Sequence, residues 1–336
     1  MDRIVSNERR NSDEPFATVF ELKRNSASDR LQWDLLIRRR PFSSRNRLVG
    51  VMMDLKSQER CKISLAHLTA LGCPPPELTH LAHRTGFDFV SFRVIQLDLS
   101  GEPNYELARN PVMLRETKAA LRSTGLKVLD VELARIKDGI DVKTYLPALE
   151  VASELQVENV ISSVWTTDKA YAKEALTELC DLAASLGIIV NLEFVTWSNL
   201  PDLQGAKELI QAVNHPNLAL LVDTIHFYRS RIKLSELDAI PKSWFRMLHL
   251  CDAPAEIPES KTELTRTGRE ARLDPGEGKI DLAQILDRIP EVPYSVEVPN
   301  LERVARVGYD EHVRLVSKHT RNYLANHPRG RRQVAV

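Results

Sequence analysis

From residue 61 onward, short apolar segments rich in β-branched residues alternate with longer segments whose apolar residues recur at helical spacing. The short segments predict eight strands, at residues 62–67, 87–93, 127–133, 159–163, 188–194, 218–223, 245–250 and 294–298. The longer segments predict helices over 75–85, 111–124, 144–156, 168–186, 203–214 and 308–325, with weaker ones at 233–238 and 281–288. Several predicted helices end at a glycine, such as Gly125, where a left-handed cap is accessible.

This alternation predicts the fold class. Strands separated by helices at this spacing are typical of a parallel sheet. Eight such units within residues 61–326 favour a closed (β/α)8 TIM barrel, an α/β fold, over an open doubly wound sheet. No GxGxxG or GxxxxGK[ST] motif follows a predicted strand, so a dinucleotide-binding or P-loop fold is disfavoured.

The two ends of the chain lack the alternation. Residues 1–60 are predicted to be an irregular, partly disordered N-terminal extension, and residues 327–336 a C-terminal tail. The extension holds 13 basic and 9 acidic residues, and most of the excess lies in 36–47. One interpretation is a basic arm that contacts an acidic partner. The simpler one is a solvated extension.

Composition narrows the function classes. Lys+Arg and Asp+Glu are both 46, so the net charge is zero, which disfavours nucleic-acid binding. No apolar run is long enough for a membrane-spanning helix. The four cysteines are scattered without metal-binding spacing, so we expect reduced thiols and a cytoplasmic location.

Charged residues interrupt the apolar segments at the ends of the last four strands. They are Glu193, Asp223, His249 and Glu297. Any one of them alone is explained by a solvated strand end or a buried hydrogen-bonded acid. Together, at the end of a barrel where active sites lie, they predict a site for one divalent metal ion, because unpaired buried carboxylates repel each other. Oxygen-rich ligands favour Mn²⁺ or Mg²⁺, with Co²⁺ or Zn²⁺ as further options.

The same four residues resemble the metal site of the xylose isomerase-like TIM-barrel superfamily. Further phrases support this resemblance over residues 62–325: Ser64-Leu-Ala-His67, Leu192-Glu-Phe-Val-Thr-Trp-Ser198, Val222-Asp-Thr-Ile-His-Phe227, His249-Leu-Cys-Asp-Ala-Pro254 and Pro275-Gly-Glu-Gly-Lys-Ile-Asp-Leu282. The superfamily contains sugar phosphate isomerases/epimerases, ketose 3-epimerases, inosose dehydratases and 3-dehydroshikimate dehydratases. The resemblance implies a metal-dependent enzyme, but it does not select the reaction.

Departures from the family pattern bear on the substrate. His226 occupies the place of a substrate-contacting histidine of the ketose epimerases, so that role carries over. Their arginine after the metal-binding histidine is missing from residues 251–258, and Asn199 replaces a carboxylate. We therefore expect a pocket unlike that of a free-ketose epimerase. Two other enzymes with this barrel are disfavoured. Endonuclease IV needs additional histidines for three zinc ions, and xylose isomerase needs ligands for a second metal, and these extra ligands are not evident in the sequence.

Five more residues near strand ends are candidate substrate-binding groups: His67, Arg93, Glu132, Trp197 and Arg272. Arg93 and Glu132 either bind substrate or pair with each other across the barrel rim. Trp197 is either a wall of the substrate pocket or a core side chain. Arg272 follows Arg266 and Arg269 in what we expect to be a long loop. The remaining histidines are expected at the surface: His80, His83, His215, His312, His319 and His327.

These features predict a metal-dependent isomerase or epimerase acting on a sugar or cyclitol carbonyl compound through a metal-bound enediolate. Glu193 and Glu297 are the candidates for removing and returning the proton. One alternative is a dehydratase or lyase that uses the same site, including a keto-glycoside-cleaving enzyme. A second alternative is a non-catalytic metal-binding barrel subunit. The expected partner is a small polyhydroxylated molecule rather than nucleic acid or a membrane, and a homo-oligomer is possible.

Overall fold

The computed structural model describes residues 5–6, 18–19, 61–97, 99 and 101–328. Contacts divide the chain into two units, Met1–Gln58 and Glu59–Val336. In the first, β1 (Val5–Ser6) pairs antiparallel with β2 (Thr18–Val19). The rest of the predicted extension lies outside the described residues, as does the predicted tail beyond residue 328.

The second unit is built around eight parallel strands that close into a barrel, in the order β10-β3-β4-β5-β6-β7-β8-β9. The strands are β3 (Ile63–Leu65), β4 (Phe89–Arg93), β5 (Lys127–Ile136), β6 (Asn159–Val164), β7 (Ile189–Glu193), β8 (Leu218–Asp223), β9 (Phe245–Leu250) and β10 (Tyr294–Val296). Each coincides with a predicted strand to within a few residues. The predicted TIM barrel is therefore confirmed.

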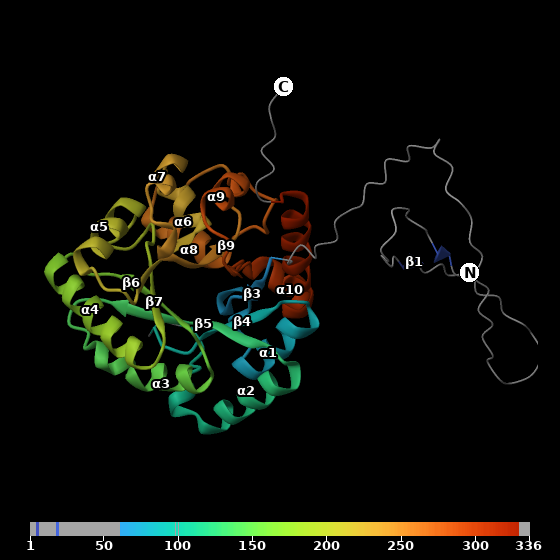
Figure 1. Ribbon diagram of the computed structural model, residues 1–336, viewed down its shortest axis with the longest axis horizontal. Coiled ribbons are helices and arrows are strands. Elements are labelled where there is room, and N and C mark those ends of the chain that lie inside the picture. Colours follow the sequence, from blue (N-terminus) through green and yellow to red (C-terminus); the bar gives the residue numbers. More distant parts are fainter. Residues whose placement is uncertain (1–4, 7–17, 20–60, 98, 100, 329–336) are drawn as a thin grey trace, which may run out of the picture. The chain divides into compact units, whose positions relative to one another are not determined.

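A ring of helices surrounds the strands (Figure 1). The predicted helices correspond to α1 (Pro75–Arg84), α2 (Pro111–Thr124), α3 (Leu146–Glu154), α4 (Lys169–Ser185), α5 (Leu203–Val213), α7 (Leu234–Asp238), α9 (Leu282–Arg288) and α10 (Leu301–Asn326). Helix α2 shows why the ends of a helix can be predicted from the sequence. The Asn110 side chain caps its first turn, Pro111 occupies the first position, and Gly125 ends it at φ +73°. Short 3-10 helices are η1 (His67–Ala70), η2 (Leu107–Arg109), η3 (Val142–Tyr145) and η4 (Lys242–Trp244).

Two helices were not predicted, α6 (Thr224–Arg229) and α8 (Lys261–Glu270). The expected long loop holding Arg266 and Arg269 was therefore wrong, because both residues lie in α8. The sequence does carry a start signal for this helix. The Ser260 side chain accepts a hydrogen bond from the backbone N–H of Glu263, as in the Ser-x-x-Glu pattern.

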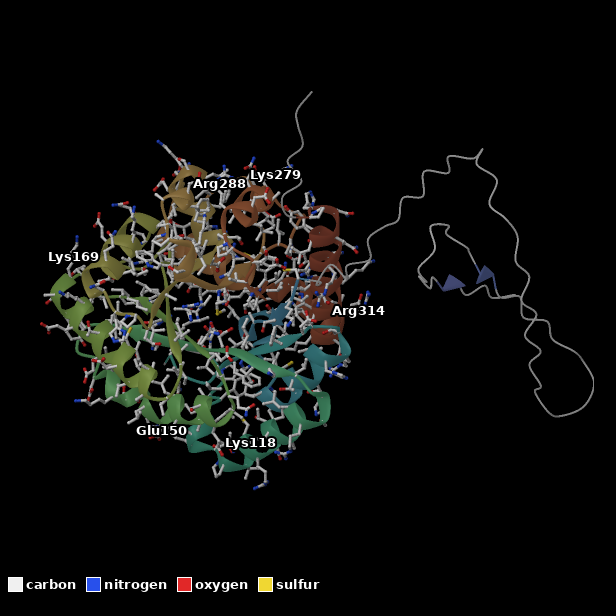
Figure 2. The ribbon with its side chains drawn as sticks, in the orientation of Figure 1. Lys118, Glu150, Lys169, Lys279, Arg288 and Arg314 are labelled. Atoms are coloured by element: carbon white, nitrogen blue, oxygen red, sulfur yellow. The ribbon has the colours of Figure 1, made fainter. Side chains whose placement is uncertain are left out.

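The apolar core has two parts. The larger lies between the strands and the helices, and the smaller fills the barrel interior with side chains that include Ile161, Leu221 and Met247. Each of these three stands two residues before a polar residue at the end of its strand. Because side chains alternate along a strand, they point to the same side and form an apolar layer beneath the polar strand ends. Labelled charged side chains such as Lys118, Glu150 and Arg314 point outward from the helices (Figure 2).

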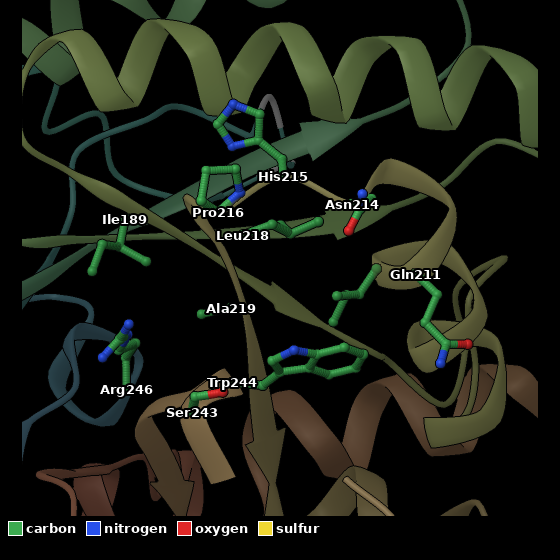
Figure 3. A pocket seen from close by; sticks show the side chains of 11 residues that line it. Ile189, Gln211, Asn214, His215, Pro216, Leu218, Ala219, Ser243, Trp244 and Arg246 are labelled. Carbon is green, nitrogen blue, oxygen red and sulfur yellow. The ribbon is translucent and has the colours of Figure 1, made fainter. Parts of the chain in front are cut away.

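A hollow of about 510 Å³ opens at the other end of the barrel, where β7 and β8 begin (Figure 3). Trp244, Arg246 and His215 are among its lining residues, and none of the lining side chains is a carboxylate. In TIM barrels the chemistry takes place at the carboxyl ends of the strands. This hollow is therefore not a candidate for the metal centre.

Candidate metal centre

The ends of four neighbouring strands bring the predicted metal ligands together. Glu193 ends β7, and Asp223 ends β8 directly beside His249 on β9. Glu297 follows the last residue of β10, the strand that pairs with β9. All four side chains are buried at the mouth of the barrel, with at most 7% of each residue exposed.

The imidazole of His249 lies among the three carboxylates. Its Nδ1 is 3.3 Å from Glu193 Oε1, 3.6 Å from Glu297 Oε2 and 3.9 Å from Asp223 Oδ2. Ligand atoms of Asp223, His249 and Glu297 all lie within 4.8 Å of one another, and so do those of Glu193, Asp223 and His226. Two overlapping groups of ligand atoms thus share Asp223.

The donor set fits a divalent cation. His249 Nδ1 is buried and has no hydrogen-bond partner, although the carboxylates surround it. Three buried carboxylates converge on His249, and Arg272 pairs with two of them, Asp223 and Glu297. Glu193 has no arginine partner among the described residues, and a buried carboxylate is costly unless a cation compensates it. Three carboxylates and one imidazole are ligands that Mn²⁺, Mg²⁺ or Zn²⁺ accept.

The ionisation of the site reflects burial and mutual charge. Burial lowers the pKa of His249, but Glu297, Glu193 and Asp223 outweigh burial and raise it to about 10. Burial raises the pKa of Glu193 to about 7, although His249 opposes this shift. Asp223 is buried as well, yet Arg272 and the two histidines hold its pKa near 2. The neighbouring carboxylates of the site therefore differ in how readily they take up a proton.

Arg272 reaches the centre from the segment after α8. Its Nη1 donates to Asp223 Oδ2 at 2.7 Å, and its Nη2 lies 2.8 Å from Glu297 Oε2. Its Nε donates to the Gly268 carbonyl at 2.6 Å, which fixes the plane of the guanidinium. The structure thus places this predicted substrate-binding residue directly against two predicted metal ligands.

His226 and Trp197 form one wall beside the centre. His226 Nε2 is 4.0 Å from Asp223 Oδ2, and its Nδ1 is 3.1 Å from the Thr196 hydroxyl. Burial lowers the pKa of His226 to about 3, despite the opposing charge of Asp223. The Trp197 ring meets the His226 ring edge-on, with centroids 4.7 Å apart. A Cβ at Gly268 would lie 2.4 Å from Trp197, so this glycine lets α8 pack on the indole.

Arg93 and Glu132 sit at the same mouth and are paired. Arg93 Nε donates to Glu132 Oε1 at 3.2 Å, and its Nη1 donates to Glu102 Oε1 at 3.2 Å. Of the two interpretations of Arg93 and Glu132, the structure shows the pairing across the rim. Arg93 lies close enough to Glu297 for their charges to interact. The pair thus borders the centre.

His67 is held by the backbone through both ring nitrogens. Its Nδ1 accepts from the Arg93 N–H at 2.8 Å, and its Nε2 lies 2.9 Å from the Cys73 carbonyl. The ring is fully buried and stacks on Tyr105, and burial lowers its pKa to about 4. In this structure His67 has no ring nitrogen free for a substrate, and it orders the β3 and β4 ends instead.

Sequence reasoning missed a polar layer in the barrel interior. Ser91 donates to Asp130 Oδ2 at 2.5 Å and lies 2.8 Å from the Ser64 hydroxyl. Asp130 is fully buried, and its Oδ1 has no hydrogen-bond partner. The available signal was an acid inside the apolar segment 127–133, the same criterion that selected the metal ligands.

A second acid–histidine group shares no residue with the first and consists of Asp274, Glu277 and His319. Arg303 donates to both Asp274 oxygens, and His319 Nδ1 lies 2.6 Å from Asp274 Oδ2. Arg303 also donates to Nδ1 of His312, which is fully buried. The expectation that His312 lies at the surface was therefore wrong, because this polar network draws it inward.

Comparisons with known proteins agree with this architecture. The chain is 27% identical over 192 residues to an inosose isomerase of Halalkalibacterium halodurans, covering 51% of this chain and 66% of that one. It is 27% identical over 157 residues to an inosose isomerase of Bacillus subtilis, covering 44% and 54%. The matches thus span between about half and two thirds of these curated relatives.

A crystal structure of IOLI protein with a binding zinc atom has the same fold. It superposes with a TM-score of 0.66 at 21% identity, covering 79% of this chain and 99% of that chain. A sequence profile described as xylose isomerase-like TIM barrel matches residues 80–318. The protein is therefore a member of the xylose isomerase-like TIM barrel family.

Proposed function

We propose that the protein is a divalent-metal-dependent isomerase or epimerase that acts on a sugar or cyclitol carbonyl compound. The observation that carries this proposal is the buried group of Glu193, Asp223, His249 and Glu297, whose histidine Nδ1 has no hydrogen-bond partner. The group lies at the carboxyl ends of the barrel strands, which is where the active sites of TIM-barrel enzymes are found. The similarity to two inosose isomerases supports a cyclitol-like carbonyl substrate.

In this proposal Asp223 and His249 are metal ligands, and Glu193 and Glu297 add carboxylate oxygens from either side. A bound divalent ion would polarise the substrate carbonyl as a Lewis acid. The protein's own contribution is proton transfer. Glu193, whose pKa burial raises to about 7, is suited to accept a proton from the carbon next to the carbonyl near neutral pH. Glu297 is the candidate for returning it.

The neighbouring residues would position the substrate. Arg272 holds Asp223 and Glu297 in place and can donate to a substrate oxygen once those carboxylates bind a cation. His226 is buried and uncharged, so it can offer a hydrogen bond to a hydroxyl without adding charge. Trp197 would exclude water from that side. The paired Arg93 and Glu132 would border the substrate's far end.

A solvent-exchange screen tests the function. The metal-loaded protein is incubated in ²H₂O with inososes, keto-sugars and dehydroshikimate, and deuterium uptake and products are measured. We expect uptake next to the carbonyl in at least one compound, and its loss with EDTA. An isomerised or epimerised product supports the main proposal, whereas loss of water or of a glycosidic group identifies the dehydratase or lyase alternative. Metal binding without any exchange would support the non-catalytic barrel.

A further inference from the structure

One arginine at the barrel mouth, Arg135, differs from its neighbours in having no ion pair among the described residues. Arg135 stands near the end of β5, and its guanidinium lies over the Trp165 ring, 4.5 Å from the ring centroid. The Nε atom is buried and has no hydrogen-bond partner. Among the described residues Arg135 forms no ion pair with any carboxylate, unlike Arg93 and Arg272 at the same mouth.

Carboxylates near Arg135 are paired with other arginines. Two carboxylates at this part of the rim, Glu102 and Glu132, are shared by Arg93 and Arg269 at 3.2 Å in each pair. Burial, together with the charges of Arg269 and Arg93, lowers the pKa of Arg135 to about 10, so it remains protonated at neutral pH. The charge of Glu102 opposes this shift, but Glu102 is paired with Arg93 and Arg269 instead of Arg135.

The strand register shows that Arg135 shares the mouth with the metal centre. Arg135 on β5 is paired with Ser163 on β6, and Ser163 is paired with Glu193 on β7. Paired residues of parallel strands face the same side of the sheet. Neighbouring strands lie about 4.8 Å apart, so β5 and β7 are separated by about 10 Å. A five- or six-carbon substrate with its carbonyl at the metal centre can extend toward Arg135.

The surroundings favour an anion. Trp165 Nε1 donates to the Ser163 hydroxyl at 2.8 Å, which fixes the indole under the guanidinium and leaves the guanidinium edge for a ligand. Arg135 also lines a hollow of about 220 Å³ together with Arg109 and Lys137, against a single carboxylate, Glu106. A planar guanidinium held on an aromatic ring is suited to bidentate binding of carboxylate or phosphate oxygens.

We propose that Arg135, supported by Trp165, forms an anion subsite that binds a carboxylate or phosphate group of the substrate. This inference rests on the proposed function, because it places the anionic end of the substrate opposite the carbonyl held at the metal centre. It predicts that the substrate is an acidic or phosphorylated polyhydroxylated carbonyl compound rather than a neutral sugar.

Calorimetric titration of the full-length, EDTA-treated protein tests the subsite separately from turnover. The probes are D-gluconate, inorganic phosphate and neutral sorbitol, at constant ionic strength set with NaCl. We expect at least one anion to bind the wild type more tightly than sorbitol, and the tighter anion identifies the group. Arg135→Met should weaken that anion at least about tenfold, since a charge-assisted hydrogen bond contributes at least about 1.4 kcal/mol. Arg135→Lys should retain part of the binding, and Arg115→Met, on the outer surface of α2, should match the wild type.

Equal affinity of wild type and Arg135→Met for both anions, or no preference of the wild type for an anion over sorbitol, would overturn the subsite. If Arg135→Met does not fold, modification of the wild type by phenylglyoxal answers the question. The preferred anion should protect Arg135, as measured by mass spectrometry, and unchanged labelling would refute the proposal. Anion binding without solvent exchange on any substrate would leave the subsite standing and remove the proposed function. If neutral substrates exchange protons with solvent, and Arg135→Met exchanges them at the wild-type rate, the proposed function would stand and the anion subsite would be refuted.

Discussion

Among the described residues, acids and histidines bring ligand atoms within 4.8 Å of one another at two places, and the surroundings of the two places differ. At the barrel mouth, Arg272 pairs with two of the three buried carboxylates, Asp223 and Glu297, and His249 Nδ1 has no hydrogen-bond partner. In the other group, Arg303 contacts both oxygens of Asp274, His319 contacts Asp274 and Glu277, and Glu277 is exposed. The first group holds a carboxylate without an arginine partner, Glu193, and a histidine nitrogen without a hydrogen bond, whereas the acid and histidine of the second are bonded to protein partners.

The contrast indicates what separates a metal centre from a structural ion network. Proximity of ligand types is the same in both groups, so it does not decide the matter. The deciding features are a buried carboxylate without an arginine partner and a ligand atom without a hydrogen bond. On this basis only the mouth, among the described residues, should bind a divalent ion.

The largest expected effect is the loss of the metal. Asp223→Ala removes the carboxylate common to both groupings of ligand atoms at the mouth, so we expect no retained metal after dialysis, as measured by elemental analysis. Activity should return in part in excess Mn²⁺. Asp274→Ala is the matched control and should retain metal like the wild type. If Asp223→Ala keeps its metal and Asp274→Ala loses it, the metal site is the Asp274 group and not the barrel mouth.

The next effect separates metal binding from proton transfer within the mouth. Glu193→Gln and Glu297→Gln keep an oxygen for the metal but cannot accept a proton at neutral pH. We expect both variants to retain metal and to lose solvent-proton exchange into substrate by at least about 10²-fold, the low end for a general base. A Gln variant that exchanges protons at the wild-type rate would show that its glutamate is not a base.

Removing the arginine of the second group should affect stability instead of metal content. Arg303→Met leaves the buried Asp274 without its bidentate donor, and an unsatisfied buried acceptor costs about 1–3 kcal/mol. Denaturant unfolding should show a loss of that size. Arg314→Met, which breaks an exposed pair with Glu311 on the same helix, should change stability little. Loss of metal from Arg303→Met at unchanged stability would contradict the structural assignment.

A smaller effect concerns Asp130, beneath the mouth. Burial raises its pKa to about 7, although the positive charge of His249 opposes the shift. An acid whose pKa is raised on folding contributes stability below its unfolded pKa of about 4, and that contribution is lost as the pH rises through 7. Asp130→Asn should therefore raise the melting temperature of the EDTA-treated protein by a few degrees at pH 8, and by much less at pH 4. A gain that does not depend on pH would rule out this linkage.

The smallest effect is expected from residues 1–58, which belong to the first of the two units, whereas the barrel strands belong to the second. Deleting them should leave the melting temperature within a few degrees and the metal content unchanged, because terminal segments usually contribute little. Failure of the shortened chain to fold would show that the extension is a structural part of the barrel.

The sequence predicted the strands and the four mouth residues because each charged residue interrupts an apolar segment at a strand end. It did not predict α8, whose only buried residue is Gly268. A helix without an apolar stripe gives no hydrophobic periodicity, and only its Ser260 cap marks its start.

The partners of buried charges were not predictable either. Arg272 meets Asp223, and Arg303 meets both Asp274 and His312, across separations of 9 to 49 residues. Such pairs depend on how elements pack in three dimensions, which local patterns do not encode. The same holds for Arg135, whose lack of a carboxylate partner is visible only once its neighbours are in place.

Anomalous diffraction from crystals grown with Mn²⁺ tests whether Glu193, Asp223, His249 and Glu297 hold one divalent ion. We expect one anomalous peak per chain at the barrel mouth, within about 2.0–2.6 Å of His249 Nδ1 and of carboxylate oxygens of the set. No peak at the mouth, or a peak at Asp274, Glu277 and His319 alone, would contradict it.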